Sequence, residues 1–92
     1  MWKIIVTSAY RRSVEQLSPE AAVKINRFFE KYRDGVSNPF DWSNLKKIAV
    51  HPGYGRLRFG KYRVGIFFDE EHRQIILTYA GKRGDFYKHF PH

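Results

Sequence analysis

The eight residues from Arg56 to Arg63 restrict the fold more than any other part of the chain, because they predict a β-hairpin. Gly60 and Lys61 form a Gly-X pair between two segments of alternating residues, and such a pair is typical of a two-residue hairpin turn. With this turn, the expected cross-strand pairs are Phe59 with Tyr62, Arg58 with Arg63, and Arg56 with Gly65. The register therefore predicts which side chains share a face.

Side chains alternate between the two faces of a strand, so the hairpin should have one apolar and one basic face. The apolar face carries Leu57, Phe59, Tyr62, Val64, Ile66 and Phe68. The other face carries Tyr54, Arg56, Arg58, Arg63, Gly65 and Phe67. Like charges directly opposite each other destabilise a ladder. We therefore predict that the apolar face packs on a core and that the three arginines bind an anionic partner.

The chain has 92 residues, enough for one hydrophobic core but not for two, so we expect residues 1–92 to form a single domain. Aromatic residues make up 17% of the sequence and supply large apolar surfaces to a small core. The absence of cysteine excludes disulfides, thiol catalysis and thiolate metal ligands. The four histidines lack a tight ligand spacing, so we expect neither a metal site nor another cofactor.

The net charge of +8 favours an anionic partner, either a nucleic acid or an acidic protein. A basic protein whose charge serves only solubility is the alternative. The first seven residues do not resemble a signal peptide, and no run approaches the roughly 20 apolar residues that cross a bilayer. We expect a cytoplasmic protein without a membrane partner.

Hydrophobic periodicity and turn residues predict the order of the elements. A first strand is expected over residues 2–7, and an amphipathic helix over residues 8–17. A second helix should begin after Ser18 as N-cap, with Pro19 at its first position, and run to about residue 33. Residues 35–44 read as a loop and residues 45–50 as a strand.

The hairpin's second strand should end at about residue 68, and residues 73–80 should form the last strand. Gly81 and Gly84 predict a break over residues 81–85, followed by a brief helical turn or tail over residues 86–90. This order predicts an α+β fold in which a helical hairpin covers one face of a mostly antiparallel sheet.

The stretch Arg56-Leu-Arg-Phe-Gly-Lys-Tyr-Arg63, followed by a strand, by Gly81-Lys-Arg83 and by Tyr87, resembles the RelE branch of the RelE/ParE toxin superfamily. That family's hairpin typically reads R-x-R-x-G-x-Y-R, and its last strand ends in a glycine-basic-arginine step with a tyrosine shortly after. The resemblance covers nearly the whole chain, because length, element order, net charge and helical hairpin agree. It implies a RelE-like fold and the toxin of a type II toxin–antitoxin pair. Its implied partners are a cognate antitoxin, messenger RNA and the ribosome.

RelE-like members cleave messenger RNA in the ribosomal A site without a metal. The ribose 2′-oxygen attacks the adjacent phosphate, leaving a 2′,3′-cyclic phosphate and a free 5′-hydroxyl. This chemistry needs groups that hold the phosphate, stabilise its extra charge and transfer protons. Arg63 and Arg83 match the family's phosphate-binding arginines, which suit this task through their fork of donors.

Other candidates leave alternatives open. Tyr87 matches a tyrosine that stacks on a base or orients the 2′-hydroxyl, although it also suits packing of the tail. Arg56 occupies a position where relatives often carry a lysine proposed as general base. Because arginine does not readily release a proton, the identity of the base is open. His51 and His89 lie near places where some relatives use a histidine as acid or base, and His51 also fits a simple turn.

Further basic residues are candidate contacts to the RNA backbone, which raise affinity without reading sequence. They are Arg58, Lys46, Lys47, Lys61 and Lys82. For each of them, a solvated residue that serves only solubility is the alternative.

Two rival functions also fit this chain. ParE-like relatives share the fold but poison DNA gyrase and usually lack the arginine and tyrosine set, so its presence here favours the ribonuclease. A non-catalytic nucleic-acid-binding domain is the second rival, in which the arginine face only grips phosphate.

Overall fold

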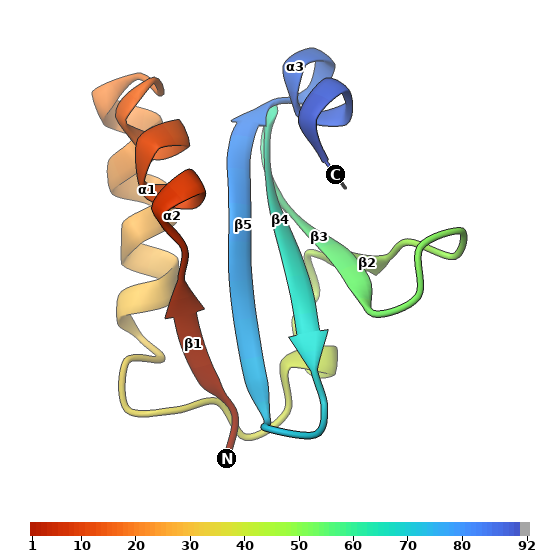
Figure 1. Cartoon of the computed structure of the whole chain (residues 1–92). Coiled ribbons are helices and arrows are strands. Elements are labelled where there is room, and N and C mark those ends of the chain that lie inside the picture. Colours follow the sequence, from red (N-terminus) through yellow and green to blue (C-terminus); the bar gives the residue numbers. More distant parts are fainter. Residues whose placement is uncertain (91–92) are drawn as a thin grey trace.

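A computed structural model describes residues 1–90, so the last two residues of the expected domain lie outside the described range. The described residues form five strands, three α-helices and one 3-10 helix, and Figure 1 shows their arrangement. In chain order they are β1 (Lys3–Val6), α1 (Ser8–Glu15), α2 (Pro19–Glu30), η1 (Pro39–Asp41), β2 (Leu45–Lys47), β3 (Tyr54–Phe59), β4 (Tyr62–Asp69), β5 (Gln74–Lys82) and α3 (Arg83–His89). The predicted order of elements is confirmed.

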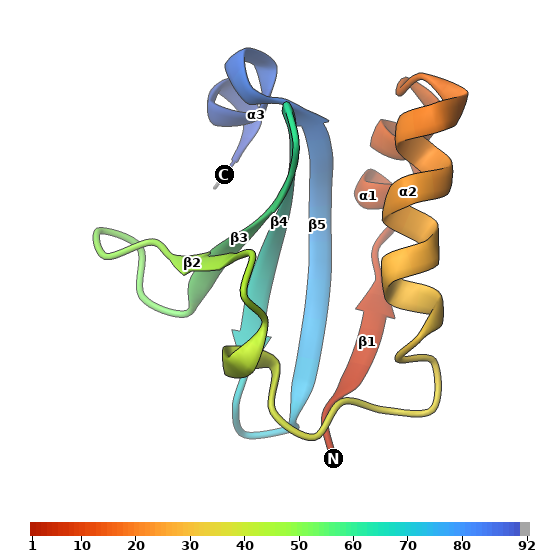
Figure 2. The ribbon, with the colours of Figure 1, turned by 180° about the vertical axis from the view of Figure 1, so that it is seen from behind.

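The strands form one sheet with the order β1-β5-β4-β3-β2. Only β1 runs parallel to its neighbour, β5, and the other pairs are antiparallel. Figures 1 and 2 show α1 and α2 on one side of the sheet and α3 on the other, above the ends of β4 and β5. The predicted α+β class, with a helical hairpin over one face of a mostly antiparallel sheet, is confirmed.

Local capping explains where the two helices of the hairpin begin. The Thr7 side chain accepts a hydrogen bond from the Tyr10 amide at the start of α1, and Ser18 accepts one from the Ala21 amide at the start of α2. The second helix ends at Glu30 rather than near residue 33, because residues 31–34 close into turns before Gly35, whose φ is 127°.

The core lies between this helical hairpin and the sheet. Its fully buried side chains include Ile25 of α2 together with Leu57 and Ile66 of the central strands. A buried hydroxyl joins the two layers, because Ser13 Oγ donates to the Tyr10 carbonyl at 2.7 Å and accepts from the Ala80 amide at 2.9 Å. Among the described residues, no helix is long and apolar enough to cross a membrane.

The hairpin has the predicted register. Phe59 pairs with Tyr62, Arg58 with Arg63, and Arg56 with Gly65. Gly60 has a φ of 61°, in the left-handed region that a two-residue turn requires at this position. The turn chemistry read from the sequence is therefore confirmed.

Replacing Gly60 with alanine is expected to lower the free energy of unfolding by about 1 kcal/mol, because an L residue in the left-handed region is strained by that amount. Space is not the cause, since the nearest atom to the new Cβ would be Lys24 Nζ at 3.8 Å. Urea unfolding measures the change. The control is Gly84→Ala, whose new Cβ lies in α3 with no atom within 4 Å. This substitution should stabilise the chain by about 0.5–1 kcal/mol, because alanine favours a helix more than glycine does. Equal effects of the two variants would contradict this account of the turn.

Two further predicted boundaries are wrong. The strand expected over residues 45–50 ends at Lys47, because residues 48–53 turn back on themselves and the His51 amide donates to the Ile48 carbonyl. The break expected over residues 81–85 is absent, because Gly81 pairs with Arg63 and Lys82 pairs with Tyr62. Strand β5 therefore continues to Lys82, and α3 begins at the next residue.

Candidate nucleic-acid interface

The face of the sheet opposite the helical hairpin is partly covered by α3. Phe86 of this helix and Phe90, which directly follows the helix, are 0% and 3% exposed, and their ring centroids lie 4.9 Å apart. Phe86 contacts the ring of Tyr79 on β5, and Phe90 contacts the ring of Tyr54 on β3. Gly65 makes this packing possible, because a Cβ at its position would overlap the ring of Phe90. The second face thus has a small aromatic core of its own.

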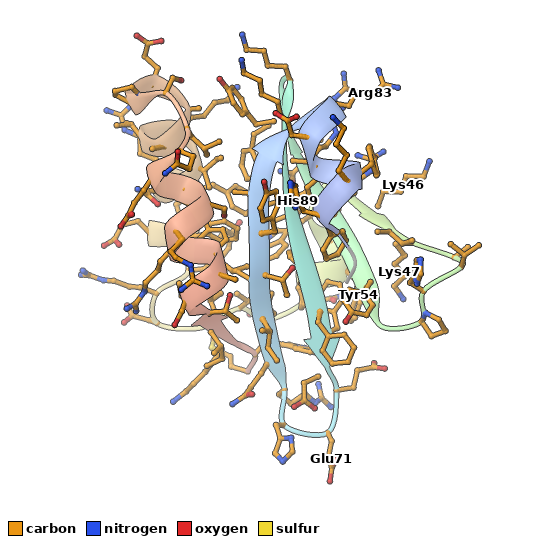
Figure 3. All side chains as sticks on the ribbon, turned by 45° about the horizontal axis from the view of Figure 1, so that its top comes forward. Lys46, Lys47, Tyr54, Glu71, Arg83 and His89 are labelled. Carbon is orange, nitrogen blue, oxygen red and sulfur yellow. The ribbon has the colours of Figure 1, made fainter. Side chains whose placement is uncertain are left out.

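The start of α3 is attached to the tip of the hairpin. The Arg83 amide donates to the Lys61 carbonyl at 2.9 Å. Arg83 itself is exposed, so its guanidinium is carried at the hairpin tip with access to solvent. Figure 3 shows Arg83 and Lys46 on the same side of the molecule.

Arg63 is buried although it is charged. It is 6% exposed, and its Nη1 donates to the carbonyls of Gly60 and Tyr62 at 2.7 and 3.0 Å. Its Nε is buried and has no hydrogen-bond partner among the described residues. The side chain therefore braces the turn with one nitrogen and retains unused capacity to donate.

Burial is the first cause that lowers the pKa of Arg63, and the nearby charges of Arg56 and Arg58 lower it further. Tyr87 acts in the opposite direction and raises the pKa of Arg63 through its hydroxyl. The guanidinium nevertheless stays charged at neutral pH. The predicted meeting of three arginines on one face of the hairpin is confirmed.

These arginines have no carboxylate partner within residues 1–90. The ion pairs in this part of the chain join Glu30 to Arg33 and Asp69 to His72, and neither of them includes an arginine of the hairpin's basic face. A cluster of guanidiniums without acids carries unbalanced positive charge, and a phosphate would balance it.

A groove of about 460 Å³ lies between the segment that follows β2 and helix α3. We call it the loop–α3 groove. Its polar walls include Lys46, Lys47, His51, Arg56 and Tyr87. Its other walls are apolar and consist of Ile48, Ala49, Val50 and Phe90. Cationic groups beside an apolar floor suit a nucleotide, which has a charged phosphate and a flat base.

The structure thus brings most of the predicted site residues together but not all of them. Tyr87, which is 52% exposed, connects the groove with Arg63. His89 points elsewhere, because its ring lies over Tyr79 with centroids 5.0 Å apart and an interplanar angle of 31°. Lys61 and Lys82 line a different hollow, at the other side of the hairpin tip.

Sequence reasoning missed the apolar walls of the groove. Ile48, Ala49 and Val50 were expected in a strand, and Phe90 in a tail. The 81% exposure of Val50 follows from a loop that projects from the sheet, as Figure 1 shows. Pro52-Gly53 was the only local signal of a turn near this segment.

No cluster of three or more histidine, aspartate or glutamate side chains is placed to hold a metal ion in residues 1–90. The groove also contains the imidazole of His51 and the phenol hydroxyl of Tyr87. Chemically, the arrangement supplies fixed positive charge, a hydroxyl and an imidazole beside an apolar surface.

The fold is that of the RelE toxins, which confirms the resemblance read from the sequence at the level of the fold. The RelB–RelE antitoxin–toxin complex from Methanococcus jannaschii contains a chain with a TM-score of 0.78 and 23% identity, covering 95% of this chain and 99% of that one. For the toxin–antitoxin complex RelBE2 from Mycobacterium tuberculosis the TM-score is 0.67, with 20% identity and coverage of 89% and 98%. The isolated RelE toxin of E. coli has a TM-score of 0.68 and 12% identity, with coverage of 89% and 84%.

No protein-family model matches this sequence, and a search of curated protein sequences finds no significant match. The similarity to known proteins therefore lies in the three-dimensional arrangement.

Proposed function

We propose that the chain is the toxin of a type II toxin–antitoxin pair and acts as a metal-independent endoribonuclease on messenger RNA in the ribosomal A site. The observation that carries this proposal is the buried Arg63, whose Nε is unpartnered and whose neighbours are arginines without a carboxylate. A buried guanidinium in such surroundings is costly unless an anion completes it. The phosphodiester of RNA is an anion of the required kind.

In the proposed reaction the ribose 2′-oxygen forms a bond to the adjacent phosphorus, and the bond from phosphorus to the 5′-oxygen breaks. The 2′-hydroxyl proton leaves to a base, and the 5′-oxygen receives a proton from an acid. Arg63 and Arg83 hold the phosphate and stabilise the charge that develops on its oxygens. Tyr87 lies between the groove and Arg63, where it orients the 2′-hydroxyl or stacks on a base.

We assign the removal of the 2′-hydroxyl proton to His51, and solvent water supplies the proton that the 5′-oxygen receives. It lines the same groove as Arg56 and Tyr87, and an imidazole exchanges protons near neutral pH. Arg56 lacks the ability to act as base and contributes charge instead. For His89, a role as acid or base stays a prediction from the sequence alone, because its ring contacts Tyr79 and does not line the groove.

The partners follow from the same proposal. Lys46, Lys47 and Arg58 are proposed to contact the RNA backbone beside the site. Solved relatives include toxins bound to RelB antitoxins, and we propose that a cognate antitoxin silences this chain in the cytoplasm.

The test is to incubate the purified chain with ribosomes carrying an end-labelled messenger RNA and to map the ends of the products. We expect cleavage in the A site, with a 2′,3′-cyclic phosphate on the upstream fragment. Arg83→Ala should lower the cleavage rate about 10²-fold, because a donor to the transition state is lost. Since Arg83 is exposed, the variant should keep its fold.

Lys31→Ala is the matched control, because it removes an exposed positive charge at the end of α2, outside the proposed site, and should leave the rate unchanged. Absence of cleavage by the wild-type chain, together with inhibition of gyrase supercoiling, would replace this proposal with the ParE-like function. RNA binding without any strand scission would replace it with a non-catalytic binding domain.

A further inference from the structure

A second basic hollow lies on the other side of the hairpin tip, outside the site described above. It has a volume of about 490 Å³ and lies between the first turns of α2 and the ends of β3, β4 and β5. Three of its walls are lysines from different elements: Lys24 of α2, Lys61 of the hairpin turn and Lys82 at the end of β5. We call it the lysine hollow.

The fold brings these three lysines to one place. Lys24 Nζ lies 3.8 Å from the position that a Cβ of Gly60 would take, so the side chain reaches from the helix to the hairpin tip. Lys82 is directly opposite Tyr62 in the β4–β5 ladder, and Tyr62 is the residue that follows Lys61. All three lysines are exposed, and their ammonium groups are free to meet a partner.

The charge of the lysine hollow is not neutralised within the part of the chain that the structure describes. Among residues 1–90, Glu20 is the one acid that lines the hollow, and no carboxylate lies within 4.0 Å of any of the three lysines. Concentrated positive charge of this kind attracts a polyanion. Tyr62 adds an aromatic surface, with Lys61 Nζ 5.8 Å from its ring centroid.

The lysine hollow and the proposed cleavage site share the hairpin tip. Lys82 and Arg83 are consecutive, and the Arg83 amide is bonded to the Lys61 carbonyl. The backbone of an RNA strand that binds Arg83 on one side of the hairpin tip can therefore cross the tip. On the other side its phosphates reach Lys61 and Lys82. An RNA strand repeats its charge along its length and can occupy both places at once, and a base can stack on Tyr62.

We propose that the lysine hollow is a second RNA-binding surface, which holds the phosphates of the strand that flanks the scissile phosphate. This inference rests on the proposed function, since it extends the path of the same RNA. The contacts are to backbone phosphates and therefore increase affinity for any sequence of sufficient length.

The test measures binding of fully 2′-O-methylated, fluorescently labelled RNA, which cannot be cleaved by attack of the 2′-oxygen. Two lengths are compared, 3 and 12 nucleotides, between 50 and 200 mM salt. The triple variant Lys24→Gln/Lys61→Gln/Lys82→Gln removes the hollow's charge. The matched control Lys3→Gln/Lys31→Gln/Arg33→Gln removes three exposed charges elsewhere, and thermal melts establish that both variants are folded.

For the 12-nucleotide RNA we expect the slope of log K against log salt to become shallower by about 2 in the hollow variant, because each phosphate contact of a single strand contributes about 0.7. The control should change it by less than about 0.5, and the 3-nucleotide RNA should bind all three proteins alike. An equal loss in both variants, or an equal loss for both RNA lengths, would overturn the proposal.

An acidic protein segment is the competing occupant. If a peptide of 12 glutamates binds the wild-type chain at least as tightly as the 12-nucleotide RNA, and loses affinity in the hollow variant, the hollow is a protein-docking surface and the inference fails. A chain that shows the expected RNA slopes but no cleavage on ribosomes would retain the lysine hollow while refuting the proposed ribonuclease. Cleavage on ribosomes together with unchanged RNA slopes in the hollow variant would support the proposed ribonuclease and refute the lysine hollow as an RNA-binding surface.

Discussion

Arg63→Lys is expected to lower the rate of RNA cleavage about 10²–10³-fold, which is the effect of removing one donor that stabilises a transition state. The substitution keeps the positive charge but replaces the planar fork with a single ammonium. In the structure one nitrogen of this fork is occupied by the carbonyls of Gly60 and Tyr62, so only the rest of the guanidinium remains for a phosphate. A lysine cannot brace the turn and bind the phosphate in the same way. Single-turnover cleavage on programmed ribosomes measures the rate.

Arg58→Lys is the matched control, because Arg58 lies directly opposite Arg63 in the hairpin but is exposed. We expect its rate to fall less than about tenfold, since an exposed cation contributes weak electrostatics that salt screens. Equal effects of the two substitutions would mean that only the charge of the face matters. Full activity of Arg63→Lys would refute the role assigned to its fork.

Phe86→Ala is expected to lower the free energy of unfolding by about 3–5 kcal/mol, the usual cost of deleting a buried aromatic side chain. Phe86 is fully buried and contacts the rings of Tyr79, Tyr87 and Phe90, so the variant leaves a cavity beneath α3. Because α3 carries Arg83 and Tyr87, cleavage should also be lost. Urea unfolding and the ribosome assay check the two effects separately.

Leu57→Ala provides the comparison, because Leu57 is equally buried but belongs to the core on the opposite face of the sheet. It should cost about 2–5 kcal/mol as well. At a temperature where both variants are folded, Leu57→Ala should retain cleavage and Phe86→Ala should not. Retention of cleavage by Phe86→Ala would show that the packing of α3 is not needed for the site.

Local signals predicted those features that depend on neighbours in the chain. The turn at Gly60 and the alternation around it gave the cross-strand pairing of Arg58 with Arg63, which the structure confirms. Ser18 and Pro19 likewise marked the start of α2, because a cap acts within one turn of a helix.

Features that depend on distant partners were predicted less well. Gly81 reads locally as a strand breaker, yet it pairs with Arg63, so the strand continues. Residues 48–50 read as a strand, but they form the apolar wall of a groove opposite α3. No pattern within either segment indicates these contacts, which are made across more than 15 residues of sequence.

The sequence by itself determined the hairpin's register, and therefore that Arg56, Arg58 and Arg63 share one face, because turn chemistry and side-chain alternation act over a few residues. Only the tertiary structure decided that Arg63 is buried while Arg58 is exposed, and that His51 and Tyr87 line one groove. These outcomes follow from the return of α3 over the sheet, where burial of Phe86 and Phe90 on the strands stabilises the helix. That apolar burial joins residues remote in the chain, and its result depends on the whole fold.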